Sequence, residues 1–216
     1  MWDRSSMSAG EHDRTDELAR AQARLRDVDH RVKNDLQLIA SVFVLQMRRL
    51  PEGGDRDLIR GALDRMGAVS AVWRRLDVSA DPRYFEASAL VGEAAQEAVG
   101  AARREDIGLN LHLSSATIPT RQAAPLALVV GELVRNSLKH AFPGRSGVIS
   151  VCLEAEGKNV ILTVSDDGVG LPPGQTAPAG FGATLIALLT QQLRGELEFA
   201  DAGPGLRALL KFPSET

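Results

Sequence analysis

The chain has a single cysteine, few aromatic residues and no long apolar run. Because Cys152 is alone, neither an internal disulfide nor a cysteine-rich zinc set can form. No stretch approaches the roughly 20 consecutive apolar residues of a membrane span. The segment from Met1 to Asp27 is polar and charged, unlike a signal peptide. These absences favour a cytoplasmic protein in a reducing compartment, with no membrane span.

The charge balance gives no electrostatic case for a nucleic-acid partner, since the net charge of the 216 residues is -3. Hydrophobic residues make up 44% of the chain, which is enough to build a globular core. Aromatic residues contribute only 4%, so that core must consist mainly of Leu, Val, Ile and Ala. The length fits one medium domain or two small ones.

The segment from Asp16 to Leu50 is predicted to form one long helix. Its apolar residues recur at alternating steps of three and four, as in the seam of a coiled coil. Pro and Gly residues at 51–55 break this helix, and a second seamed helix is predicted from about Asp57 to Asp77. Two such helices make a hairpin, which leaves apolar surface open for a second copy or for the rest of the chain. The first seam consists of Leu25, Val28, Val32, Leu36, Ile39, Phe43 and Leu50.

After a polar linker at residues 78–84 the pattern changes to mixed helix and strand. A sheet that is largely antiparallel, with helices segregated from it, predicts an α+β sandwich for this part. We expect Thr120 to be the N-cap of its central helix. The predicted helices are 87–101, 120–142 and 182–193, the predicted strands are 107–113, 148–153, 159–164, 197–200 and 206–212, and 171–179 is predicted to be a loop.

A polar stripe is predicted on the central helix. Glu132, Asn136 and His140 are four residues apart, and Lys139 is three residues from Asn136, so the four side chains share one face. The Asn oxygen suits a hard cation such as Mg²⁺, and the lysine can balance phosphate charge. For this stripe taken alone, an ordinary solvated polar face is the better explanation.

Two glycine-rich segments follow. The segment from Asp166 to Gly170 comes directly after a predicted strand, where an aspartate can accept a hydrogen bond from an amine such as that of adenine. A plain β-turn is the alternative. The segment from Gly180 to Ile186 opens a helix after a loop, and backbone amides at such a position bind phosphate. A simple joint between loop and helix is the alternative there, and the sequence has no P-loop motif.

Taken together, these segments resemble the ATP-binding boxes of sensor histidine kinases. PLALVVGELVRNSLKHAFP, residues 125–143, resembles their N box. DDGVGLP, residues 166–172, is similar to their first glycine box, and GFGATLI, residues 180–186, to their second. The order and spacing also agree. The resemblance implies the Bergerat ATP-binding fold that these kinases share with gyrase and Hsp90-type ATPases.

The resemblance also implies a role for each residue that matches a box. Asn136 would hold Mg²⁺, and Lys139 and His140 would face the phosphates of ATP. Asp166 would bind adenine. The pocket and its lid would be shaped by Gly168, Gly170, Gly180, Phe181 and Gly182.

The first helix contains HRVKNDLQLI, residues 30–39, which resembles the phosphoacceptor segment of the His-Arg-x-Lys-Asn subfamily related to the HWE kinases. His30 lies just off the apolar seam, so its ring is expected to face solvent, where a neutral imidazole is a competent nucleophile near pH 7. The resemblance implies autophosphorylation of His30 and transfer to an aspartate of a response regulator receiver domain. Glu132 and Asp29 are both candidates for the general base, and Asn34, by analogy, would orient a water for dephosphorylation.

The expected organisation is a tail at residues 1–15, a phosphoacceptor hairpin at 16–78 and an ATP-binding domain at 85–216. A tail of that length is too short for a sensor domain, so either a separate sensor protein or a longer kinase is expected. The hairpin seams favour a homodimer. Two alternatives remain at this point: a histidine phosphotransferase or docking module with little ATP turnover, and a serine kinase of the anti-sigma type, which would not need the hairpin.

Overall fold

The computed structural model describes residues 39–41, 43–44, 53–76 and 83–214. The chain divides into two compact units, of which the first ends at Leu63 and the second runs from Asp64 to the C-terminus. The division falls within helix α2 (Gly54–Leu76), which agrees closely with the second predicted hairpin helix. Residues 39–41 and 43–44 are helical, as expected for the first hairpin helix. His30, Asp29 and Asn34 lie outside the described residues, and the predicted domain boundaries stay predictions.

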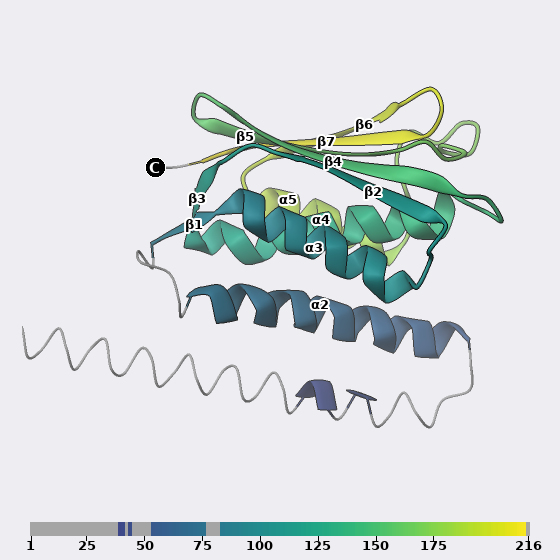
Figure 1. Cartoon of the computed structure of the whole chain (residues 1–216), viewed down its shortest axis with the longest axis horizontal. Coiled ribbons are helices and arrows are strands. Elements are labelled where there is room, and N and C mark those ends of the chain that lie inside the picture. Colours follow the sequence, from purple (N-terminus) through teal and green to yellow (C-terminus); the bar gives the residue numbers. More distant parts are fainter. Residues whose placement is uncertain (1–38, 42, 45–52, 77–82, 215–216) are drawn as a thin grey trace, which may run out of the picture. The chain divides into compact units, whose positions relative to one another are not determined.

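The second unit is built on a five-stranded sheet in the order β2-β4-β5-β7-β6 (Figure 1). The first pair, β2 and β4, is parallel, and the other three pairs are antiparallel, which confirms a largely antiparallel sheet. A small two-stranded sheet, which the sequence pattern did not predict, joins β1 (Tyr84–Glu86) to β3 (Thr117–Pro119). The large sheet contains β2 (Ile107–Leu113), β4 (Gly147–Glu156), β5 (Asn159–Asp166), β6 (Glu196–Asp201) and β7 (Leu206–Pro213).

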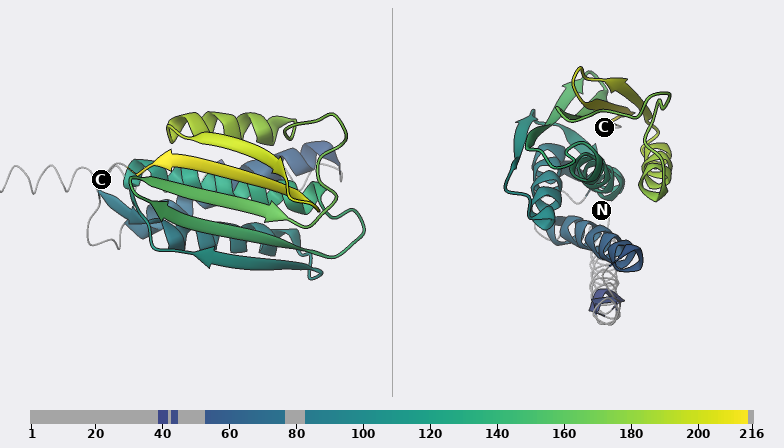
Figure 2. Two further views of the ribbon diagram at one scale, coloured as in Figure 1. Left: turned by 90° about the horizontal axis from the view of Figure 1, so that it is seen from above. Right: turned by 90° about the vertical axis from the view of Figure 1, so that its right-hand side faces the viewer.

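Three helices lie on one face of this sheet (Figures 1 and 2): α3 (Ala87–Ala102), α4 (Thr120–His140) and α5 (Phe181–Gln192). The strands turn alternate residues toward these helices, so that Val160, Leu162 and Val164 of β5 are buried while their neighbours are half-exposed. On α4 the buried side chains include Leu126 and Val130. The predicted α+β sandwich is therefore confirmed, with a core of aliphatic residues.

One detail of α4 differs from the prediction. Pro119, not Thr120, is the N-cap residue, and it makes no side-chain capping hydrogen bond. The N–H of Thr120 instead donates to the carbonyl of Arg83, at 2.9 Å, because the helix follows directly from β3 and its pairing with β1. The predicted N-cap was therefore wrong by one residue.

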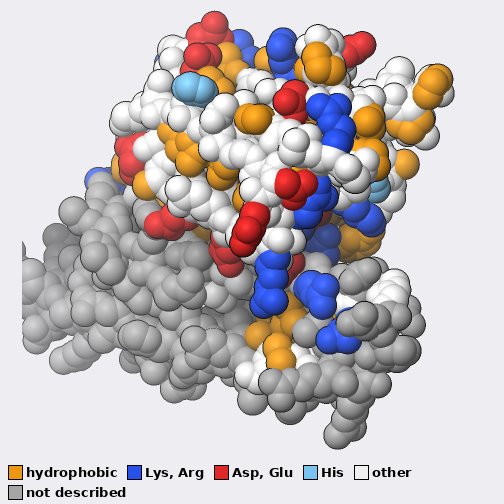
Figure 3. Space-filling view, turned by 45° about the vertical axis from the view of Figure 1, so that its right-hand side comes forward, with side chains coloured by type: hydrophobic (Ala, Val, Ile, Leu, Met, Phe, Trp, Pro, Cys, Tyr) orange, Lys and Arg blue, Asp and Glu red, His pale blue; other side chains and the backbone are white. Residues whose placement is uncertain are grey.

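The surface of the second unit carries both signs of charge. On the face in Figure 3, acidic and basic side chains are mixed rather than gathered into one patch, as the small net charge of the chain would suggest. Among the described residues, no helix combines the length and the apolar character that crossing a membrane requires.

Candidate functional site

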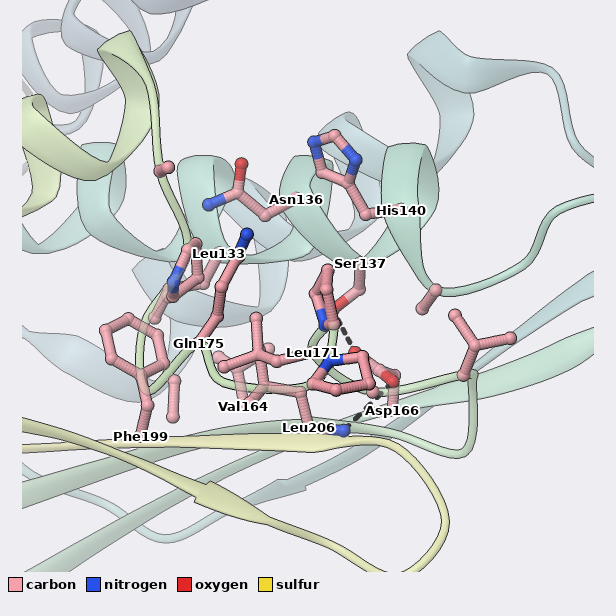
Figure 4. A pocket seen from close by; sticks show the side chains of 18 residues that line it. Leu133, Asn136, Ser137, His140, Val164, Asp166, Leu171, Gln175, Phe199 and Leu206 are labelled. Atoms are coloured by element: carbon pink, nitrogen blue, oxygen red, sulfur yellow. Dashed lines mark hydrogen bonds between the residues drawn. The ribbon is translucent and has the colours of Figure 1, made fainter.

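A cavity of about 520 Å³ opens between α4, the end of β5 and the loop that leads to α5 (Figure 4). Its walls are largely aliphatic, with Leu133 from α4, Val164 from β5 and Leu171 from the loop. Phe199 of β6 adds one aromatic ring. A mostly apolar cavity with a few polar groups is the usual form of a small-molecule site. The polar side chains that line it are Asn136, Ser137, His140, Asp166 and Gln175.

Asp166 is the most firmly held of these polar groups. Its side chain is buried, and one carboxylate oxygen, Oδ2, accepts a hydrogen bond from Ser137 Oγ at 2.7 Å. The other oxygen, Oδ1, accepts from the backbone N–H groups of Gly168, at 3.1 Å, and Leu206, at 3.2 Å. Since Oδ2 has used one lone pair, it can accept a second donor from the cavity, such as an amine on a flat ring.

Glycines allow the backbone to close around Asp166. A Cβ atom on Gly168 would overlap the Cβ and carbonyl oxygen of Ala141 at the end of α4, where the N–H of Val169 donates to the same carbonyl at 3.0 Å. Gly205 has a φ of +95°, and a Cβ there would overlap the carbonyl oxygen of Asp166. The first glycine box therefore needs a third glycine, Gly205 from the turn before β7, which sequence reasoning missed.

The predicted polar stripe on α4 divides into three environments. Asn136 is half-buried, and its Nδ2 atom is enclosed without a hydrogen-bond partner among the described residues. Lys139 and His140 are exposed at the C-terminal end of the helix, and only His140 lines the cavity. Partial burial, with a smaller contribution from the charge of Lys139, lowers the pKa of His140 and favours its neutral form.

Glu132 departs most from a solvated polar face, since the residue is only 3% exposed. Arg65 of α2 grips both carboxylate oxygens, with Nε 2.7 Å from Oε1 and Nη2 3.1 Å from Oε2. Arg135 adds a third bond to Oε1 at 2.6 Å. Burial alone would raise the pKa of Glu132, but the hydrogen bonds and charges of the two arginines outweigh it and hold that pKa below its usual value.

The second glycine box lies at the edge of the cavity rather than in its lining. Gly180 has a φ of +97° and precedes Phe181, the first residue of α5. At Gly182 a Cβ would lie 3.1 Å from Glu132 Oε2 and 3.4 Å from Asn136 Oδ1. The missing side chain therefore lets the N-terminus of α5 approach the polar groups of α4. Of the predicted glycines, Gly170 alone lines this cavity, while Gly168 lines an adjoining one.

Sequence reasoning found the acidic and amide groups of the site but not their supports. Ser137 was inside a recognised box, and its place beside Asn136 was a signal that could have been used. Arg65 carried no such signal, because 67 residues separate it from Glu132. Gln175 and Phe199 were likewise not singled out, since loop and edge-strand residues have no pattern that points into a cavity.

Comparison with known proteins agrees with this geometry. Residues 27–100 match the family model described as histidine kinase, and residues 121–216 match that of the histidine kinase-, DNA gyrase B- and HSP90-like ATPases. Blue-light-activated histidine kinase 2 of Erythrobacter litoralis is 27% identical over 94% of this chain and 61% of its own length. Sensor histidine kinase PdtaS of Mycobacterium tuberculosis is 28% identical over 91% of this chain and 40% of its own. The chain thus spans less than two thirds of each of these relatives.

Solved structures agree on the fold. The blue-light-activated histidine kinase EL346 of Erythrobacter litoralis superposes with a TM-score of 0.65 at 25% identity, over 88% of this chain and 62% of that one. Its histidine kinase domain alone gives 0.66 at 21% identity, over 82% of this chain and 96% of that one. The ATP-binding domain of PrrB from Mycobacterium tuberculosis gives 0.53 at 22% identity, over 62% of this chain and 97% of that one. With both of its family models matched in order and its fold shared with kinase domains, the chain belongs to the histidine kinases.

Proposed function

We propose that the chain binds ATP in the cavity beside α4 and transfers the γ-phosphoryl group to His30. The observation that supports this most directly is Asp166, whose two carboxylate oxygens are held by Ser137, Gly168 and Leu206 at the base of an apolar cavity. A fixed, buried acceptor of this kind is suited to the exocyclic amine of adenine, and the aliphatic walls are suited to its ring.

In this arrangement the phosphates of ATP extend from the Asp166 end of the cavity toward Asn136 and the N-terminus of α5. That end offers helix N–H groups with a favourable dipole, and Lys139 supplies a positive charge close by. Adenine at one end and phosphates at the other therefore account for both glycine boxes with one ligand.

The residues present also fit Mg²⁺. The Asn136 amide is half-buried, its nitrogen has no hydrogen-bond partner among the described residues, and its oxygen faces the glycine at position 182. An oxygen ligand from the protein, completed by phosphate oxygens and water, is the usual way that this ion is held. When bound, it neutralises phosphate charge as the reaction proceeds.

In the proposed reaction a ring nitrogen of His30 attacks the γ-phosphorus of ATP. A nitrogen–phosphorus bond forms, the bond from that phosphorus to the bridging oxygen breaks, and ADP leaves. The imidazole proton passes to a base, for which Glu132 and Asp29 remain the two candidates. Asn34 would orient a water when the phosphoryl group is removed, and the usual acceptor would be an aspartate of a response regulator.

The proposal extends to the setting in which the chain works. We place it in the cytoplasm as a homodimer, taking its signal from a sensor that is either a separate protein or part of a longer kinase. The two family matches support a kinase core of this kind. They also make the serine kinase alternative less apt, because the first match covers the hairpin segment that such a kinase does not need.

The test is incubation of the purified chain with γ-labelled ATP and Mg²⁺, beside His30→Ala and Asn136→Ala. We expect acid-labile label on the wild type and none on either variant. Label that persists in His30→Ala would place the acceptor elsewhere. Binding of ATP without label would point to a missing activator, and absence of ATP binding would move the chain to the phosphotransfer or docking class.

A further inference from the structure

Arg65 lies outside all the recognised boxes, on α2, yet its side chain ends beside the phosphate end of the proposed site. It meets Glu132 as a two-pronged fork, with nitrogen–oxygen distances of 2.7 and 3.1 Å. The Arg65 side chain is 22% exposed and that of Glu132 is 4% exposed, so the pair is largely removed from water. The same planar fork is the geometry with which arginine binds phosphate.

A second contact links Arg65 to the helix that follows the loop over the cavity. The guanidinium carbon lies 4.9 Å from the centre of the Phe181 ring, within the range of a cation–π contact. Phe181 is the first residue of α5 and is 64% exposed. Arg65 is thus placed where α5 begins, which is the end of the cavity assigned to the phosphates.

The distances at Gly182 connect this arginine to the cation-binding amide. A Cβ on Gly182 would lie 3.1 Å from Glu132 Oε2 and 3.4 Å from Asn136 Oδ1. Glu132 and Asn136 are therefore adjacent around one point of the α5 N-terminus. Consecutive turns of a helix bring such side chains within about 5–6 Å of each other. Glu132, which binds the Arg65 guanidinium, is thus one helical turn from Asn136, the residue proposed to hold Mg²⁺.

Two guanidinium groups share one carboxylate at this point. The negative charge of Glu132 is shared by Arg65 and Arg135, each of which is positive. The Nε atom of Arg135 is enclosed without a hydrogen-bond partner among the described residues. Two adjacent guanidinium groups favour the arrival of an anion such as phosphate. Three donors already bind the Glu132 oxygens, so in this state the carboxylate is poorly disposed to accept a further proton.

We propose that Arg65 binds the γ-phosphate of ATP and that, until ATP enters, Glu132 holds the Arg65 side chain in position. This inference rests on the proposed kinase function. When ATP binds, the Arg65 fork exchanges the carboxylate for γ-phosphate oxygens and stabilises the charge that develops on them during transfer. Glu132 loses two of its three donors in the same exchange and becomes available to accept the imidazole proton. The same movement of Arg65 thus stabilises the γ-phosphate and frees Glu132 to act as the base.

The test compares two ligands that differ by the γ-phosphate. Affinities for ADP and for a non-hydrolysable ATP analogue, both with Mg²⁺, are measured by calorimetry on the full chain and on Arg65→Ala. We expect the variant to bind the ATP analogue about tenfold less tightly, which is about 1.4 kcal/mol, and to keep its affinity for ADP within about twofold. Arg65→Lys keeps the positive charge but not the two-pronged geometry. Its affinity for the ATP analogue should therefore lie between those of the wild type and Arg65→Ala.

Two further variants sharpen the comparison. Arg104→Ala removes an arginine with the same fork geometry, 2.7 Å from both oxygens of Asp106 and outside the lining of the cavity, and should leave the ratio of the two affinities unchanged. Glu132→Gln weakens the ion pair with Arg65 and should increase the affinity for the ATP analogue relative to the affinity for ADP.

Several results would overturn the inference. If Arg65→Ala lost the same affinity for both ligands, Arg65 would have only a structural role. If it lost affinity for neither, Arg65 would not contact the nucleotide. Tighter binding of the ATP analogue by Arg65→Ala would mean that the Arg65–Glu132 ion pair hinders ATP binding. All three would leave the proposed function intact, whereas a wild-type chain that binds neither ligand would contradict that function itself.

Discussion

Asp166 receives its hydrogen bonds from three parts of the chain: α4, the turn after β5 and the start of β7. The contribution of α4 is a single hydroxyl, that of Ser137, at 2.7 Å. A buried carboxylate that loses a donor is left with unmet hydrogen-bonding capacity, and its oxygens become free to change direction. The orientation of the proposed adenine acceptor should therefore depend on this hydroxyl.

Replacing Ser137 with alanine should weaken nucleotide binding more than it weakens the fold. A hydrogen bond to a charged group contributes about 1.5–3 kcal/mol, so we expect at least a tenfold lower affinity for ADP in calorimetry. Ser165 is adjacent to Asp166 but faces the opposite side of the sheet, which makes Ser165→Ala a matched control. Equal affinities for the wild type and Ser137→Ala would show that the backbone donors alone position Asp166.

Gly205 provides a second test at the same scale. In Gly205→Ala the new Cβ would overlap the Asp166 carbonyl, and the residue would also keep a φ of +95°. Gly144 is the control, since it has a φ of +66° but nothing within 4 Å of the position that a Cβ would take. We expect Gly144→Ala to cost about 1–2 kcal/mol in urea unfolding, from the backbone alone. Gly205→Ala should cost about 1–3 kcal/mol more, with loss of nucleotide binding, and equal costs would contradict the overlap.

Single residues were predictable from the sequence where their signal was local. Asp166 was found because it ends an alternating strand and begins a glycine-rich turn, all within a few positions. Its partners were not found, because Ser137 is 29 residues away and Leu206 is 40 residues away. Only the folded sheet brings them together, and no spacing rule on one strand or helix describes such a meeting.

At the scale of elements, helical periodicity predicted some features of α4 and missed others. Spacing by three and four residues correctly indicated a shared face for Glu132, Asn136 and His140. It did not indicate that Glu132 would be buried while His140 stayed exposed, since the burial of Glu132 depends on Arg65 of α2 and on the start of α5 at Gly182. The strand positions were predicted well, because alternation marks a half-buried sheet, whereas the short β1–β3 pair had too few residues for any period.

The ion pair between α2 and α4 should appear in the pH dependence of stability. The pKa of Glu132 is lower in the folded chain than in the unfolded one. The contribution of its ionised side chain to the free energy of unfolding is therefore complete above the ordinary glutamate pKa of about 4.3. That contribution is lost as pH falls through the lowered pKa. We expect the free energy of unfolding to fall less steeply with acidification in Glu132→Gln than in the wild type. Urea titrations between pH 3 and 7 would measure this, and parallel curves would contradict it.

At the scale of the whole molecule, the proposed acceptor His30 is far along the chain from the residues that line the proposed ATP cavity. Ligand binding to the cavity should stabilise the second unit without needing His30, the proposed acceptor. ADP with Mg²⁺ at about 100 times its dissociation constant adds about 2.7 kcal/mol to the folded state. Calorimetric melting should show this gain in the wild type and in His30→Ala. Asp166→Asn should show little gain, and a gain equal to that of the wild type would mean that adenine binds elsewhere.

The last strand of the domain is also one of its inner strands, because β7 lies between β5 and β6 and carries Leu206, a donor to Asp166. A chain emerging from the ribosome presents β2, β4 and β5 long before β7. Until β7 emerges, the sheet lacks an inner strand, and Asp166, the proposed adenine acceptor, lacks one of its donors. In the proposed reaction, a translation product that stops short of β7 would therefore keep His30 but lack the ATP cavity, and we expect it to receive phosphate only from complete copies of the protein.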